Sequence, residues 1–115
     1  MATAQRVVRV FYRDYQNEVS ISSTQPESLL AERLVPLADR LLSSPDNFLG
    51  VVDRGDRILQ CYVSDDPGAI VFELLEPESP GCWRSILPRD LALDRLRDLP
   101  DRFDTALLPE AEHID

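Results

Sequence analysis

The sequence predicts a single α+β domain in which two main helices pack on an antiparallel sheet of about six strands, in the order β-β-α-β-β-β-β-α. The chain has 115 residues, of which 43% are hydrophobic, and this suits one domain with one core. Short β-branched and aromatic runs alternate with turn residues, and two stretches carry leucines at helical spacing. We expect the domain to span residues 1–108 and residues 109–115 to form a frayed acidic tail.

The N-terminal segment is predicted to form a β-hairpin. Residues Arg6–Arg13 are rich in β-branched and aromatic side chains, which favour a strand. A turn near Gln16-Asn17 then leads to a second strand, in which Val19 and Ile21 point to one side. This pair of strands would begin the sheet.

A helix is predicted to follow the hairpin. Thr24 and Glu27 fit a capping box, in which each residue bonds the backbone amide of the other. Pro36 removes one helix hydrogen bond, so it should either kink this helix or split it near Val35. The apolar stripe of the helix would consist of Leu30, Leu34, Leu37, Leu41 and Leu42.

Four short strands are predicted in the centre of the chain, before the second helix. The segments NFLGVVD and RILQCYV flank Arg54-Gly55, while GAIVFELL and GCWRSIL follow the turn Asp65–Gly68 and the loop Glu76–Pro80. Tight turns favour antiparallel pairing, and apolar residues on both strand faces indicate a sheet covered on one face and partly covered on the other. Pro88 would open the second helix and Pro100 would end it. The stripe of this helix would be Leu91, Ala92, Leu96 and Leu99.

The composition is acidic, and its bases are all arginine. The net charge is −9, and the residues from 58 onward carry thirteen acids against five arginines. Such a field repels nucleic acid and anionic lipid and attracts basic partners, although net charge also serves solubility alone. No apolar run reaches the ~20 residues of a membrane helix, and the N-terminus lacks the apolar stretch of a signal peptide. We therefore expect a cytoplasmic protein.

Few residues indicate catalysis. His113 is the only histidine and lies in the expected tail, where packing would not position it as a base. Cys61 and Cys82 do not make a zinc site with one histidine, and a reducing compartment disfavours a disulfide between them. We therefore expect no cofactor, no metal and no enzymatic activity. A small enzyme that uses paired carboxylates and a metal is the least favoured hypothesis.

The tripeptide Arg54-Gly55-Asp56 matches an adhesion motif. We interpret it as the turn of a hairpin, because a two-residue turn needs a positive φ that glycine adopts without steric cost. The adhesion motif would also require secretion, for which the sequence shows no signal.

The stretch from Phe48 to Pro100 combines a strand with Leu59-Gln60, an acidic turn at Asp65-Asp66, a strand with Phe72-Glu73 and a late helix over Leu91–Leu99. This pattern resembles immunity proteins of bacterial polymorphic toxin systems. The resemblance implies an α+β protein that binds and occludes a cognate toxin through its surface. It carries over no catalytic residues.

An acidic surface would be steered onto the basic active site of a toxin that acts on nucleic acids or nucleotides. Trp83 is a candidate contact, and the alternative is that it packs under the second helix. An acidic secretion chaperone that holds an effector segment is the alternative, and since such chaperones usually dimerise, a monomer favours the immunity protein. The candidate contacts are Asp65, Asp66, Glu76, Glu78 and Trp83, with Asp94, Asp98 and Asp101 as alternatives.

Overall fold

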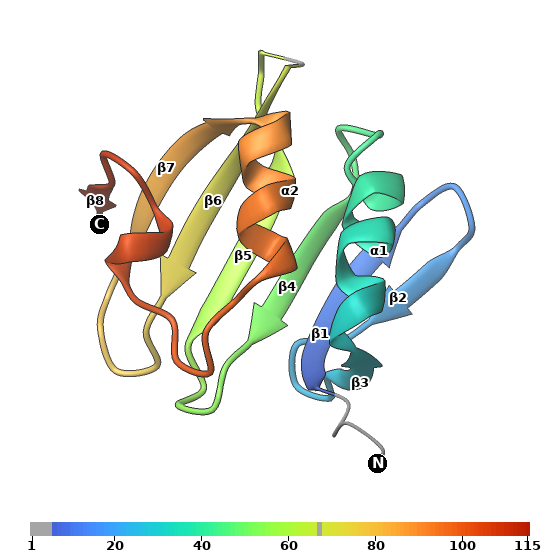
Figure 1. Ribbon diagram of the computed structural model, residues 1–115, viewed down its shortest axis with the longest axis horizontal. Coiled ribbons are helices and arrows are strands. Elements are labelled where there is room, and N and C mark those ends of the chain that lie inside the picture. Colours follow the sequence, from blue (N-terminus) through green and yellow to red (C-terminus); the bar gives the residue numbers. More distant parts are fainter. Residues whose placement is uncertain (1–5, 67) are drawn as a thin grey trace.

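The computed structural model describes residues 6–66 and 68–115, and it confirms the predicted α+β fold with two helices on an antiparallel sheet (Figure 1). Pro67 of the expected turn, and residues 1–5 of the expected domain, lie outside the described residues. The sheet has eight strands instead of about six. The elements are β1 (Val7–Asp14), β2 (Val19–Ile21), β3 (Glu27–Leu30), α1 (Leu34–Leu41), β4 (Phe48–Val52), β5 (Ile58–Val63), β6 (Ala69–Leu75), β7 (Cys82–Pro88), α2 (Arg89–Arg97) and β8 (Glu112–Ile114), with 3₁₀ turns at Ala31–Arg33 and Thr105–Leu107.

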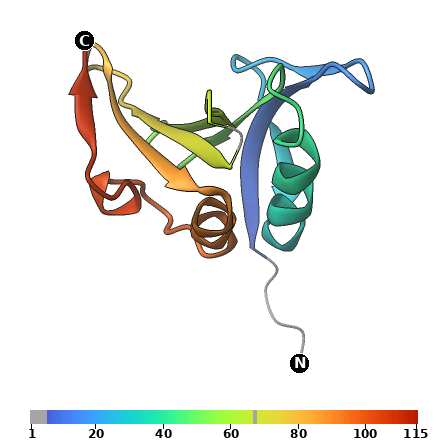
Figure 2. The same ribbon diagram turned by 90° about the horizontal axis from the view of Figure 1, so that it is seen from above.

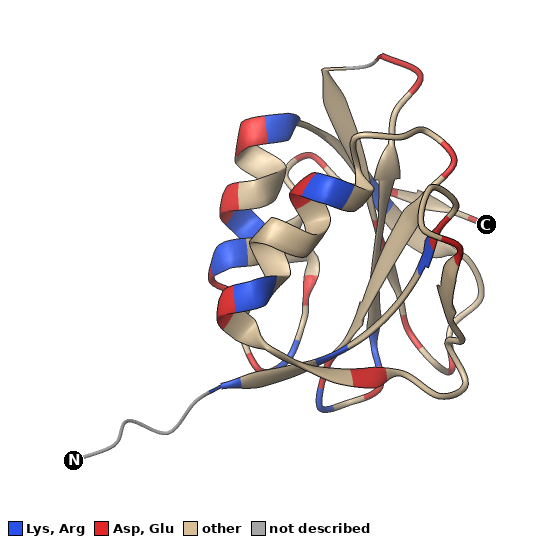
Figure 3. Ribbon diagram, turned by 90° about the vertical axis from the view of Figure 1, so that its right-hand side faces the viewer, with Lys and Arg blue, Asp and Glu red and all other residues tan. Residues whose placement is uncertain are grey.

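The strands follow the order β2-β1-β4-β5-β6-β7-β8, and β3 pairs with β1 beside β2. Each of these pairs is antiparallel. Seen from above, β8 and the β1–β2 hairpin lie at opposite edges of a strongly twisted sheet (Figure 2). Both helices lie on the same side of the sheet (Figure 3). We call the other side, which no helix of the described residues covers, the open face.

The core lies between the helices and the sheet. Strand alternation places one set of side chains under the helices, and these are almost fully buried. The helices contribute Ala38, Leu41, Ala92 and Leu96, whereas Leu91, expected in the apolar stripe of α2, is exposed. The strand residues that face the helices are Val10, Leu49, Val51, Leu59, Cys61, Ile70, Phe72, Leu74 and Leu87.

The predicted start of the first helix is wrong. Glu27–Leu30 form β3, which pairs with β1 so that Val7 lies opposite Leu30. The Thr24 side chain bonds the Ser22 hydroxyl at 2.8 Å rather than capping a helix. The capping box is a local signal, and pairing along the unsatisfied edge of β1 overrides it because that edge needs backbone partners.

Pro36 neither kinks nor splits a helix. Helix α1 begins at Leu34, so Pro36 is its third residue. An amide in the first turn has no partner within the helix, and proline is tolerated there. The proline therefore lies near the beginning of a shorter helix.

The expected frayed tail is also wrong. Residues 112–114 form β8, which pairs with β7 so that Ile114 lies opposite Cys82. The segment that leads to it buries Phe103, Leu107 and Leu108 in the core. These apolar anchors just before the tail hold the C-terminal strand against the sheet, whereas the polar composition of residues 109–115 alone indicated no strand.

The Arg54-Gly55 turn has a different geometry from the one predicted. The loop between β4 and β5 contains five residues, and Asp56, not Gly55, has the positive φ of 64°. Aspartate is among the residues that tolerate the left-handed region. The Asp53 carboxylate organises this loop, since it accepts the amides of Gly55 and Arg57 at 2.8 Å each.

Candidate functional site

A row of mainly apolar side chains crosses the open face. Phe48, Tyr62, Val71 and Ile86 lie opposite one another on β4, β5, β6 and β7, and we call them the apolar row. Ile86 is 59% exposed, more than any other large hydrophobic side chain of the described residues. Phe48 and Tyr62 are half-buried and Val71 is buried, so Ile86 is the exposed member of the row.

A polar cluster lies two residues away from the apolar row along β5, β6 and β7. Glu73 is nearly buried, and it faces Gln60 on β5 and Arg84 on β7. Its Oε2 accepts from Arg84 Nε at 2.8 Å, Arg84 Nη2 at 2.6 Å and the Tyr62 hydroxyl at 3.0 Å. Charge-assisted bonds of this kind hold a side chain in one orientation. Tyr62 and Arg84 are thus positioned before any partner arrives.

The pKa shifts in this cluster keep its two donors, Tyr62 and Arg84, protonated at neutral pH. Burial, followed by the hydrogen bond to Glu73, raises the pKa of Tyr62, while the bond to Glu73 raises the pKa of Arg84. Burial also raises the pKa of the Cys82 and Cys61 thiols, so neither is an activated thiolate. At neutral pH the cluster presents a neutral tyrosine and a charged guanidinium.

A hollow of about 560 Å³ continues the open face toward the β1–β2 hairpin. Its lining includes Phe11, Phe48 and Arg13, whose guanidinium stacks 4.7 Å from the Tyr15 ring centroid. The Phe11 ring covers Gly50 so closely that a Cβ there would lie 2.0 Å from the ring. Gly50 therefore allows the aromatic side chain to lie flat on the sheet.

Four exposed carboxylates gather at one end of the sheet. Asp65 and Asp66 occupy the β5–β6 turn, and Asp90 is the second residue of α2, whose Arg89 amide donates to Gly68 O of that turn. Asp46 lies just before β4, which starts beside the end of β5. Figure 3 shows the acidic tip of the β5–β6 turn projecting at the top. None of the four forms an ion pair within residues 6–66 and 68–115, and we call them the acidic end.

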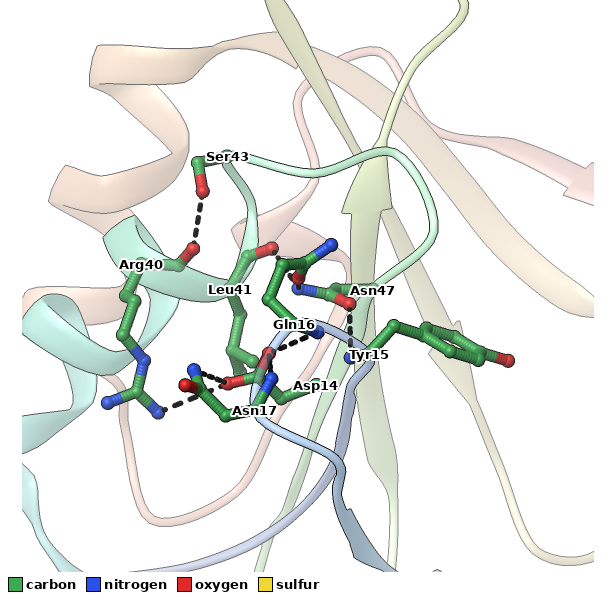
Figure 4. Close-up of polar contacts among 8 residues, drawn as sticks. All are labelled: Asp14, Tyr15, Gln16, Asn17, Arg40, Leu41, Ser43 and Asn47. Atoms are coloured by element: carbon green, nitrogen blue, oxygen red, sulfur yellow. Dashed lines mark hydrogen bonds and ion pairs between the residues drawn. The ribbon is translucent and has the colours of Figure 1, made fainter.

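A buried network holds the loop that carries Asp46 (Figure 4). Asn47 donates to Leu41 O at 3.0 Å and accepts the Tyr15 amide at 2.9 Å. The loop is thereby tied both to the end of α1 and to the β1–β2 turn. Asp14, 2% exposed, fixes that turn by accepting from Asn17 Nδ2 at 2.8 Å.

The hydrogen bonds to Asp14 should make the free energy of unfolding depend on pH. The Asn17 side chain, two backbone amides and Arg40 lower the pKa of Asp14, although burial opposes them. A carboxyl with a lowered pKa stabilises the fold above its unfolded pKa of about 4, and this contribution is lost as pH falls through the folded pKa. Asp14→Asn should therefore destabilise the protein at pH 7 and progressively less in acid. Urea unfolding between pH 7 and pH 3 measures this.

The variant Asn17→Ala tests the cause, since it removes the largest contribution to the shift and keeps the carboxylate. Its stability should depend on acid less steeply than that of the wild type. Parallel pH profiles for all three proteins would contradict the assignment.

The structure does not bring the predicted contact residues together. Glu76 and Glu78 lie in the β6–β7 loop, at the opposite end of the sheet from Asp65 and Asp66. Trp83 packs on the helix side, with its ring 5.0 Å from that of His113. Of the three alternative contacts, Asp94 on α2 pairs with Arg97 at 2.7 Å, Asp101 pairs with Arg6 at 3.3 Å, and Asp98 is exposed just after the helix. Glu76 lies 3.9 Å from Arg57.

The residues that the sequence did not select are Tyr62, Glu73, Arg84 and Ile86 of the open face, and Asp46 and Asp90 of the acidic end. One signal was available: Glu73 is a single charge within the apolar strand AIVFELL, and such a charge needs a partner. The partner, Arg84, could be found only once the register of β6 and β7 was known. Gln60 and Glu73, which both belong to the resembling pattern, are direct neighbours across the sheet.

No family model matches the chain, and no curated protein or solved structure matches it. Within the described part of the chain, no three histidine, cysteine or acidic side chains are grouped so that they could hold a metal ion. No helix among the described residues has the length and apolar character needed to cross a membrane.

Proposed function

We propose that this chain is a non-catalytic protein-binding domain, an immunity protein that occludes a bacterial toxin with a basic surface. The observation that carries the proposal is the acidic end, where Asp46, Asp65, Asp66 and Asp90 are exposed and form no ion pair with any described residue. Elsewhere many carboxylates are neutralised locally, as Asp39 is by Arg89 at 2.7 Å. Charge left unpaired at one end of a protein steers a partner of opposite charge.

Occlusion requires only that the bound surface prevents substrate entry, so the inhibitor needs no chemistry of its own. Electrostatic steering predicts fast, salt-sensitive association. We propose that the protein acts as a monomer, since a net charge of −9 opposes self-association. Light scattering tests that part of the proposal.

Charge reversal at the tip of the β5–β6 turn should slow association. The variant Asp65→Arg/Asp66→Arg is compared with Asp94→Arg/Asp98→Arg, which makes the same charge change on α2 and beyond its end. The first should reduce the association rate with a toxin encoded beside the gene about tenfold at low salt, and the second much less. Stopped-flow measurements at two ionic strengths give both rates. Equal rates for the two variants, or no binding and no rescue of toxin-expressing cells, would end the proposal.

A further inference from the structure

The apolar row leads along β5 to the turn that carries Asp65 and Asp66 of the acidic end. Val63 and Ser64 connect Tyr62 of the row to Asp65, so about 10 Å of extended chain separates the two. Asp46 approaches the same row from β4, because it lies two residues before Phe48. An apolar strip bordered on one side by unpaired charge has the anatomy of a protein interface.

The polar cluster borders the other side of the row with positioned donors. Arg84 uses Nε and Nη2 on Glu73, while its Nη1 has no hydrogen-bond partner among the described residues. Tyrosine and arginine are enriched at binding hot spots, and the fixing of their side chains lowers the entropy that binding costs. Tyr62 and Arg84 meet both conditions.

The unpaired carboxylates of the acidic end indicate which kind of partner can bind this surface. A second copy of this chain would bring its own acidic end against the first, and nucleic acid or an anionic membrane would be repelled by the same carboxylates. A segment with apolar side chains flanked by arginine or lysine satisfies both parts of the surface. Its backbone carbonyls can accept from Arg84 Nη1.

We infer that the apolar row, bordered by the acidic end and by Arg84, is the docking surface for a basic, apolar-centred polypeptide segment. The inference deepens the proposed function, and it rests on that function only for the claim that the segment belongs to a toxin. It moves the centre of binding from the acidic turn, where the sequence placed it, onto the open face. Ile86 becomes the expected central contact.

The experiment uses a display library of random 16-residue peptides selected against the full chain, followed by synthesis of the most enriched peptide. Affinity is measured for the wild type, Ile86→Asp and Leu91→Asp. Leu91 is the matched control, because it is also an exposed large hydrophobic residue, 37% exposed, but lies on α2. Circular dichroism verifies that each variant folds. A fourth variant, Asp65→Asn/Asp66→Asn, tests the acidic rim.

Selected peptides should combine basic with apolar residues. Ile86→Asp should weaken binding on the order of tenfold or more, and Leu91→Asp should leave it nearly unchanged. The rim variant should weaken binding several-fold at low salt and less at high salt. The inference is overturned if no peptide enriches, if enriched peptides are acidic, or if Ile86→Asp and Leu91→Asp behave alike. A wild-type dimer that Ile86→Asp converts to a monomer would show that a second copy is the occupant, and this also overturns it.

A toxin assay separates this inference from the proposed function. Neutralisation that Ile86→Asp leaves intact would remove the docking surface and keep the immunity function. Peptide binding through the row, combined with no effect on the toxin, would keep the surface and remove the function.

Discussion

Replacement of Asp53 by alanine should lower the free energy of unfolding by about 3 kcal/mol. The Asp53 side chain is 5% exposed and serves three backbone amides. Its Oδ1 accepts from Gly55 and Arg57, and its Oδ2 accepts from the buried Phe103 amide at 2.6 Å. Hydrogen bonds to a charged acceptor are among the stronger ones, and a buried amide left without a partner also carries an uncompensated desolvation cost.

The size of this effect follows from what the three amides connect. Gly55 and Arg57 belong to the β4–β5 loop, whereas Phe103 belongs to the segment between α2 and β8. Asp53 therefore links the central hairpin to the C-terminal part of the core, beside the Arg57 Nη1 bond to Phe103 O at 3.0 Å and the Arg54 amide bond to Asp101 O at 3.2 Å. The amides of the loop can turn to water after the substitution, but the Phe103 amide is enclosed. The loss of the hydrogen bond from the Phe103 amide should therefore account for the larger share of the decrease in stability.

Thermal and urea unfolding measure the effect, and the melting temperature should fall by roughly 10–15 °C. Asp56→Gly is the control within the same loop. It removes an exposed ion pair with Arg9, which contributes little, and it relieves a φ of 64°. This variant should be as stable as the wild type or slightly more so. If Asp53→Ala and Asp56→Gly unfold together, the network is not what stabilises the loop.

The loop also shows where sequence reasoning succeeded and where it stopped. The hairpin and its position were predicted because apolar strands flank Arg54-Gly55. The residue with positive φ was not, because the conformation depends on backbone amides that donate to the Asp53 carboxylate, and one of these belongs to a segment fifty residues away. Local patterns predict that a turn exists, whereas distant partners decide its shape.

The same distinction applies to the candidate site. The acidic turn at Asp65 and Asp66 was predicted because hydrophobic strands and turn residues identify it locally. The apolar row could not be predicted, because it depends on the register of four strands and on which face the helices cover. Ile86 looks like a core residue in sequence, and only the placement of α2 on the other face exposes it.

Replacement of Gly81 by alanine should detach β8 and destabilise the protein by about 2 kcal/mol or more. Gly81 has a φ of 76°, which costs an L-residue about 1–2 kcal/mol. A Cβ at this position would also lie 2.1 Å from the Ile114 carbonyl oxygen and 3.0 Å from Asp115 Cα. Those atoms are backbone, so β8 itself must move. Because β8 is a three-residue edge strand, it has few contacts with which to resist.

Two measurements detect the detachment of β8 from the sheet in Gly81→Ala. Trp83 is the only tryptophan, and its ring meets His113 of β8 edge to face, so its fluorescence should change when β8 leaves. Amide exchange of residues 112–114 should accelerate at the same time. Gly55→Ala is the control, since a Cβ there meets its nearest atoms at 3.6 and 3.8 Å and requires no positive φ. That variant should be close to neutral.

A truncation after Ala111 divides the cost of Gly81→Ala into its two causes. In the truncated chain the clash with Ile114 no longer exists, so the substitution should cost only the backbone strain, about 1–2 kcal/mol. In the full chain it should cost this amount plus the docking energy of β8. If the cost is equal in both chains, β8 contributes nothing to stability. If Gly81→Ala is as stable as Gly55→Ala, the close contact between Gly81 and Ile114 is absent in solution.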